Sequence, residues 1–168
     1  DNGSTPLPAE AVTLARTLQM AGYQTAAFIG AFILDRPYGF DHGFGEFDSR
    51  FERFEAGDKL KAERIAGQVT APALAWLGRL RPNQPFFAWV HLYDAHTPYS
   101  APPPFGARFR QQPYDGEVAY VDSEIARLLA QLETMGALER TVVVAIADHG
   151  ESLGEHGEED HGLFLYDA

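Results

Sequence analysis

The alternation of apolar runs with helical periods along this chain predicts an α/β domain. Three segments are nearly continuous in apolar residues and predict buried strands, at 24–29, 86–92 and 141–147. Elsewhere, apolar residues recur at spacings of three and four and predict helices over 8–21, 58–80 and 115–135. Strands linked by helices in this order run parallel, so we expect a mostly parallel sheet flanked by helices on both faces.

Prolines and glycines mark the exceptions to this regular pattern. Pro72 lies inside the second helix and is expected to kink it or divide it near Thr70, because proline cannot donate a backbone hydrogen bond. Residues 31–54 are rich in glycine, aspartate and phenylalanine without a lasting period, and they predict an irregular loop. Residues 97–113 contain five prolines and predict an extended loop with neither a helix nor an inner strand.

The size and charge of the chain restrict what it can be. At 168 residues it can form one domain with a sizeable core. It starts at Asp1 without a methionine and stops at Ala168 directly after an apolar run, so we expect residues 1–168 to be a single partial domain. The net charge of −11 disfavours nucleic acid and anionic membranes as partners, since both are bound through clustered Lys and Arg. No apolar run approaches the ~18 residues of a membrane span.

The absence of cysteine narrows the chemistry further. Within these residues there can be no disulfide, thiolate zinc site or cysteine nucleophile. Five of the six histidines instead fall between residues 91 and 161, at or beyond the ends of two predicted strands. Ligands bind outside the carboxyl ends of the strands in open α/β sheets, so this clustering predicts a site.

Asp148 and His149 follow the 141–147 strand directly and are the candidate metal ligands. A carboxylate and an imidazole on a rigid strand end supply both ligand types that a divalent cation takes from a protein. The alternative is an aspartate that caps the next turn beside a solvated histidine. Oxygen-rich ligation favours calcium, or magnesium, and the imidazole leaves manganese and zinc open.

His96 and His161 are the candidate catalytic residues. His96 could contact an anionic substrate oxygen or transfer a proton near neutral pH, or it could only anchor its loop. His161, in a glycine-containing loop, could protonate a leaving oxygen or hold the anion. We interpret His91 as a strand-end residue satisfied by its neighbours, and Asp94 either as a turn cap or as a residue that orients a histidine.

These residues lie in motifs that resemble the sulfatase family of the alkaline-phosphatase superfamily. DHGESLGEHG at 148–157, with a strand before it and His161 after it, resembles the C-terminal part of the family core. HLYDAHTPY at 91–99 resembles the family's second histidine motif. GYQTAAFIG at 22–30 and YGFDHGF at 38–44 resemble an earlier helix, strand and loop of that family.

The resemblance implies an enzyme that hydrolyses anionic esters, either small molecules or glycans, with a divalent cation bound by Asp148, His149 and acidic residues upstream. His96 matches the family histidine that contacts the sulfate or phosphate group. His161 stands where many sulfatases have a lysine on the same anion. The resemblance is compatible with an extracytoplasmic or periplasmic location, which the residues themselves do not indicate. The oligomeric state does not follow from the sequence.

The family's nucleophile motif and first metal aspartates have no counterpart after Asp1. Sulfatases use a formylglycine made from cysteine or serine, whereas related phosphatases and phosphotransferases use serine or threonine, so the nucleophile is open. We therefore expect residues 1–168 alone to be nearly inert and to bind metal weakly. Sulfate ester hydrolysis is the leading hypothesis. Its alternatives are hydrolysis or transfer of a phosphate or phosphonate group, and a non-catalytic binding module that retains the fold.

Overall fold

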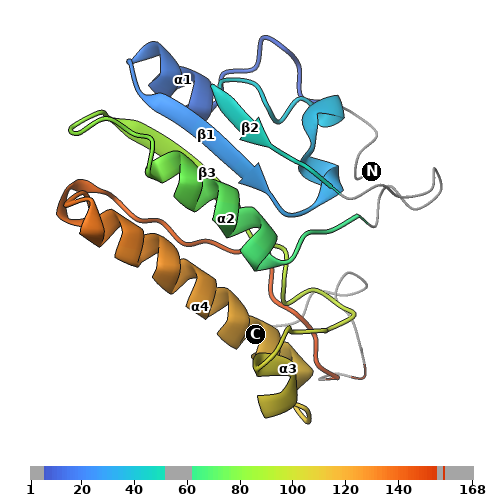
Figure 1. Ribbon diagram of the computed structural model, residues 1–168. Coiled ribbons are helices and arrows are strands. Elements are labelled where there is room, and N and C mark those ends of the chain that lie inside the picture. The colour runs from blue at the N-terminus through green and yellow to red at the C-terminus, as the bar shows by residue number, and fades with distance from the viewer. Residues whose placement is uncertain (1–5, 52–61, 155–156, 158–168) are drawn as a thin grey trace.

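A three-stranded parallel sheet forms the centre of the computed structural model, which describes residues 6–51, 62–154 and 157. The strands are β1 (Gln24–Ile29), β2 (Glu46–Asp48) and β3 (Phe86–His91), in the order β2-β1-β3. β1 pairs in parallel with both neighbours, with Ala26 opposite Glu46 on one side and opposite Ala88 on the other. The parallel sheet of the sequence analysis is confirmed, and Figure 1 shows its strands side by side.

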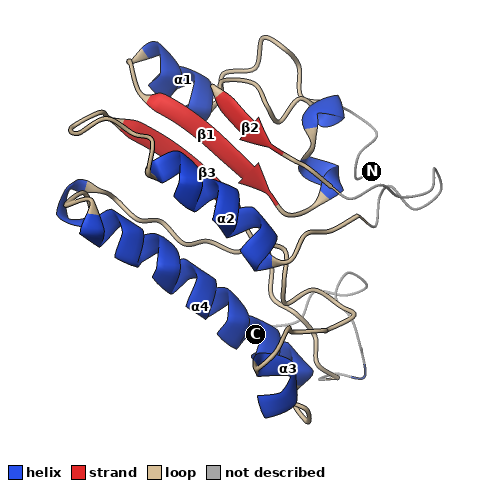
Figure 2. Ribbon diagram, in the orientation of Figure 1, coloured by secondary structure: helices blue, strands red, loops and turns tan. Residues whose placement is uncertain are grey.

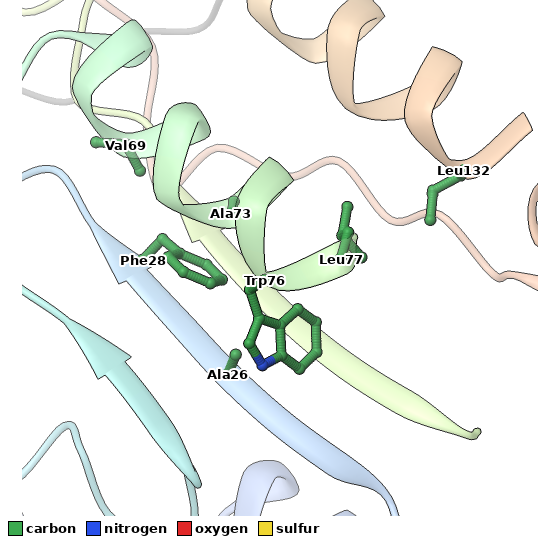
Figure 3. Close-up of a cluster of buried hydrophobic side chains, with 7 residues drawn as sticks. All are labelled: Ala26, Phe28, Val69, Ala73, Trp76, Leu77 and Leu132. Carbon is green, nitrogen blue, oxygen red and sulfur yellow. The ribbon is translucent and has the colours of Figure 1, made fainter. Parts of the chain in front are cut away.

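Helices cover both faces of this sheet (Figure 2). The helices are α1 (Leu14–Met20), α2 (Ala66–Leu77), α3 (Phe105–Arg108) and α4 (Pro113–Thr134). On one face, α2 packs on Ala26 and Phe28 of β1, and α4 contributes Leu132 to the same cluster (Figure 3). On the other face, Ala27 and Ile29 of β1 pack with Phe47 and with aromatic residues of the loop around β2, beside α1. Alternate residues of β1 are thus buried on opposite faces, as expected for an inner parallel strand.

β2 and two 3-10 turns lie inside the segment predicted as an irregular loop. The 3-10 turns are η1 (Phe32–Leu34) and η2 (Arg36–Tyr38). The sequence prediction was wrong for β2, because three residues are too few to set up a recognisable alternation. β2 forms because the backbone of β1 offers an edge with which Glu46–Asp48 can pair.

The proline inside α2 does not divide the helix, which was one of the two outcomes that the sequence predicted for it. α2 runs unbroken from Ala66 to Leu77 through Pro72. The carbonyl of Gln68, four residues before Pro72, accepts a hydrogen bond from Arg64 Nη2 at 2.5 Å instead of from a backbone N–H. The guanidinium therefore supplies the donor that proline lacks, which removes one cost of the proline. The predicted first part of this helix, at residues 58–65, is not helical where it is described.

The other helices differ from their predicted bounds for local reasons. α1 begins at Leu14 and not near Pro8, because the Thr13 hydroxyl caps it by accepting the Arg16 N–H at 3.1 Å. The short helix α3 lies in the proline-rich segment that was predicted to have none, after its last consecutive proline, Pro104. Within the described residues, none of the helices is long and apolar enough to cross a membrane.

The segment 141–147 is the largest departure from the sequence prediction. It is not a buried strand in the described structure: its backbone forms no ladder, and Ile146 is 90% exposed. After α4 the chain turns back, and the segment runs in the same general direction as the strands (Figure 1). β-branched residues favour an extended backbone, but a strand also needs a neighbour in hydrogen-bonding register, and no described residue takes that place.

Candidate functional site

His96 lies in a tight loop directly after β3. Its ring stacks on Tyr93 with the ring centroids 4.6 Å apart and the planes 23° apart. His96 Nδ1 is 2.8 Å from the carbonyl oxygen of Thr97, and since a carbonyl can only accept, Nδ1 carries a proton. The imidazole is therefore held by a ring on one side and by its own loop on the other. Nε2 is the ring nitrogen whose protonation can change.

The loop around His96 is closed by Glu117 of α4. Glu117 Oε2 accepts the backbone N–H of Ala95 at 2.7 Å, and Oε1 accepts the backbone N–H of Ser100. Glu117 is only 6% exposed. Ala95 has a φ of +71°, a left-handed conformation that is unfavourable for a residue with a side chain, so the loop needs such contacts to hold it.

Asp94 does not orient a histidine by any hydrogen bond that the described structure shows; it acts as a cap. Its carboxylate lies near the backbone N–H of Ala66, the first residue of α2, whose own N-cap Ile65 has no side chain that could cap the helix. Burial raises the pKa of Asp94, the backbone N–H opposes this, and the nearby charge of Glu117 adds to the increase. Asp94 thereby ties the end of β3 to the start of α2.

A further carboxylate, Glu63, belongs to the surroundings of His96. Solvent still reaches Glu63, but partial desolvation raises its pKa. The charge of His96 opposes the increase, and the charges of Glu117 and Asp94 contribute to it. Glu63 therefore lies close to His96 and to two other acids, Glu117 and Asp94.

His91 is satisfied by its neighbours, as the sequence analysis interpreted it. Its Nδ1 accepts the N–H of Gly30 at 3.3 Å, so the ring nitrogen that can carry the proton is Nε2. Gly30 has to be small here, because a Cβ would lie 2.8 Å from the carbonyl oxygen of His91. Burial lowers the pKa of His91, and the charge of Asp148 opposes that change.

Because the charge of Asp148 acts on His91, Asp148 lies near the carboxyl end of β3. The ring of His91 lies 6.1 Å from that of Trp89 and 6.0 Å from that of Tyr93, measured between centroids. Tyr93 in turn stacks on His96. Asp148 and His96 therefore lie toward the same end of β3, where the sequence analysis expected them to meet.

Asp148 and His149 are exposed in the described structure. The Asp148 side chain is 92% exposed, and its Oδ2 lies 3.6 Å from His149 Nε2. His149 Nδ1 is 2.7 Å from the carbonyl oxygen of Gly150 and so carries a proton. No group of three histidines or acids that could hold a metal ion occurs in residues 6–51 and 62–154. His161, and with it any contact that it makes, lies outside the described residues.

Sequence reasoning missed Glu117, and also Glu124 seven residues later on the same face of α4. Both are buried, whereas the apolar Val118 beside Glu117 is exposed. Glu124 accepts the Thr70 hydroxyl and pairs with Arg127 Nη1 at 2.6 Å. The available signal was the repeat of an acid at a spacing of seven, which places both on one face of a helix.

The comparisons with known proteins agree with this architecture. The phosphonate monoester hydrolase of Agrobacterium radiobacter superimposes on 99% of this chain with a TM-score of 0.71 and 17% sequence identity, and the match spans 52% of that chain. BT4656, solved in complex with its substrate D-glucosamine-2-N,6-O-disulfate, matches 66% of this chain with a TM-score of 0.50 and 20% identity, over 24% of its own length. The chain shares its fold with the Agrobacterium hydrolase and with a Vibrio parahaemolyticus protein described as a member of the alkaline-phosphatase superfamily.

The sequence comparisons define the family. The family model described as Sulfatase matches residues 1–165, and the chain belongs to the sulfatase family. Human iduronate 2-sulfatase is 35% identical over 69 residues, which make up 41% of this chain and 12% of that protein. The chain thus spans about half of the solved neighbour from Agrobacterium and a smaller part of its curated relative. Hydrolysis of sulfuric esters is the activity of this family.

Proposed function

We propose that the full-length protein hydrolyses sulfate esters, with a divalent cation held in part by Asp148 and His149 and with His96 on the anionic group. The observation that carries the proposal is the family match over residues 1–165. Small-molecule esters and sulfated glycans are the substrate class, since a sulfated sugar is the substrate named for one protein of the same fold.

The local chemistry of Asp148 and His149 fits a cation. Oδ2 and Nε2 are 3.6 Å apart, and two ligands of one ion at roughly 2.0–2.5 Å are separated by about 3–4 Å. The Nδ1 proton of His149, directed at the Gly150 carbonyl, leaves Nε2 as the nitrogen whose lone pair can bind metal, which is the usual arrangement of a histidine ligand. The remaining ligands would come from residues outside the described part. A bound cation would polarise the ester and lower the pKa of the nucleophile.

His96 would contribute on the substrate side. With Nδ1 bonded to the Thr97 carbonyl, Nε2 can donate a hydrogen bond to an anionic oxygen when the ring is protonated. His161 would contact the same anion or protonate the leaving oxygen. Calcium is the favoured cation, with magnesium, manganese and zinc as the alternatives.

Transfer or hydrolysis of a phosphate or phosphonate group is the second candidate. The observation that favours it is the TM-score of 0.71 to a phosphonate monoester hydrolase over nearly the entire chain. An imidazolium and a cation neutralise a tetrahedral phosphonate as well as a sulfate, so His96, Asp148 and His149 do not separate the two. The nucleophile decides between them.

The test compares matched esters in the full-length protein. We expect p-nitrophenyl sulfate to have a kcat/KM at least tenfold above that of p-nitrophenyl phenylphosphonate, with activity lost in a chelator and restored by calcium, magnesium, manganese or zinc. A preference for the phosphonate would favour the second candidate. Turnover that persists in the chelator would contradict the cation. A folded protein that binds a sulfated sugar but turns over neither ester, with or without Asp148→Ala, would be a binding module.

A further inference from the structure

Glu117 differs from the other buried acid of α4 in what its carboxylate holds. Both oxygens of Glu117 accept backbone N–H groups, from Ala95 and from Ser100, and these two residues enclose the His96–Tyr99 loop. Glu124, equally buried and two helical turns further on, binds a side chain of α2 and Arg127 of its own helix. Glu124 joins helix to helix, whereas Glu117 joins a helix to the loop that carries His96.

The contacts of His96 depend on this loop being closed. The ring stacks on Tyr93, which precedes Ala95, and bonds through Nδ1 to the carbonyl of Thr97, which follows His96. The stacking contact requires the chain to turn back between residues 93 and 96, whereas the contact with Thr97 joins adjacent residues. Ala95 makes that turn with a φ of +71°, which an alanine does not favour by itself. Hydrogen bonds from a charged carboxylate are among the strong ones, so Glu117 can hold the turn.

α4 is a rigid support for this function. It is a helix of 22 residues that packs against α2 through Tyr120, whose hydroxyl accepts the Gly67 N–H at 2.8 Å, and through Leu132 in the core. A loop fixed to α4 is therefore fixed to the sheet as well.

From this geometry we propose that Glu117 is a positioning residue, which sets the place and direction of the His96 imidazole through the backbone of residues 95–100. The inference rests on the proposed function of His96. Glu117 touches neither ester nor cation and acts only through the loop.

A double-mutant cycle in the full-length protein tests whether Glu117 acts through His96. Glutamine keeps the shape of Glu117 but has one acceptor oxygen, so one of the two amides loses its partner. Glu117→Gln is expected to lower kcat/KM for p-nitrophenyl sulfate by about tenfold to a hundredfold, the scale of a misplaced catalytic group. In a His96→Ala background the same change is expected to cost less than about twofold, because there is no imidazole left to misplace.

The controls separate positioning from stability and from charge. Glu124→Gln removes a buried charge on the same face of α4, and Glu133→Gln removes an exposed one. Both are expected to leave kcat/KM within about twofold of wild type under conditions where they are folded. If Glu117→Gln is too unstable to assay, Glu117→Asp keeps the charge but is one methylene shorter and cannot reach both amides. An equal loss from the Glu117 change with and without His96 would overturn the proposal.

Amide hydrogen exchange gives a readout that does not need turnover. Exchange in a peptide covering residues 93–100 is expected to be at least tenfold faster in Glu117→Gln than in wild type and unchanged in Glu124→Gln. If the wild-type protein hydrolyses no ester, the proposed function fails, and this measurement still decides the role of Glu117. Equal exchange in the three proteins would show that the carboxylate does not hold the loop.

Discussion

Two aspartates end extended segments of this chain, and their surroundings differ in every respect. Asp48, at the end of β2, is 8% exposed and lies 2.8 Å from Arg64 Nη1. The Arg64 guanidinium is buried too, and it donates to the carbonyls of Ile29, Asp48 and Gln68. Asp148, at the end of the 141–147 segment, is almost fully exposed, beside His149. The first carboxylate is committed to holding the fold, and the second is available to a ligand.

The comparison shows how position and partner decide what an acid does. Burial lowers the pKa of Arg64, and the charge of Asp48 together with the hydrogen bond to its side chain opposes that change. Such a pair stabilises only while both members are present. An exposed carboxylate contributes little to folding and can be replaced without unfolding the protein. We therefore expect changes at the Asp48–Arg64 pair to lower stability and changes at Asp148 to lower activity.

The largest effect is expected for the buried pair. Arg64→Ala leaves Asp48 charged and buried and removes the donor to Gln68, so we expect it to lower the free energy of unfolding by about 3–5 kcal/mol. Arg50→Ala is the control, because Arg50 also pairs with Asp48 but is exposed, and it should cost less than about 1 kcal/mol. Urea unfolding of the full-length protein measures both. Equal midpoints for the two variants would contradict the structural role of Arg64.

The second prediction is that a change at Asp148 lowers activity and leaves stability nearly unchanged. Asp148→Ala is expected to change the free energy of unfolding by no more than about 0.5 kcal/mol, because the side chain is exposed. The same change should lower kcat by roughly a hundredfold or more, the scale of a lost cation ligand, and weaken calcium binding in calorimetry. Asp122→Ala, an exposed acid of α4, should leave both unchanged. An Asp148→Ala variant that is destabilised but keeps the wild-type kcat would contradict this role of Asp148.

The third prediction tests whether Arg64 replaces the backbone N–H that Pro72 lacks. In an Arg64→Ala background the carbonyl of Gln68 has lost its guanidinium partner, and Pro72→Ala supplies a backbone N–H four residues further on. The two changes should therefore couple favourably by about 0.5–1 kcal/mol in a double-mutant cycle of urea unfolding. Additive free energies would indicate that water satisfies Gln68.

The smallest effect is a pH dependence from Asp94. Because burial raises its pKa in the folded state, the folded protein holds that proton more tightly than the unfolded chain does. The resulting stabilisation is present below the unfolded pKa and is lost as the pH rises through the folded one. Asp94→Asn should therefore gain melting temperature relative to wild type between pH 3 and pH 7, whereas Asp122→Asn should show no such trend. A constant difference across this range would exclude the effect.

The sequence predicted the parts of the fold that depend on local pattern. β1 has the predicted bounds because an apolar run ends at Gly30, and α4 ends close to Gly136 as predicted but starts two residues early, at Pro113. The parallel order followed from the alternation of strands and helices. The family was predicted from the motifs at 91–99 and 148–157, and the match over residues 1–165 confirmed it.

What the sequence did not predict depends on distant partners. The burial of Glu117 follows from two backbone N–H groups in a loop some twenty residues away, and nothing in the local pattern signals them. The continuity of α2 through Pro72 depends on Arg64, which lies outside the helix. The apolar run at 141–147 indicated a strand, but strand formation depends on a neighbour that the run does not encode. The roles of His96, His161, Asp148 and His149 stay predictions.

The exposed segment at 141–147 affects the solubility of residues 1–168 as an isolated polypeptide. Val142, Val143, Val144 and Ile146 all expose more than half of their surface, and among the residues that the structure describes the segment has no strand partner. Short, uncharged, β-branched stretches of this kind pair readily with copies of themselves. Concentrated samples of this polypeptide should self-associate edge to edge through that stretch, and a lysine placed at Val144 should keep them dispersed.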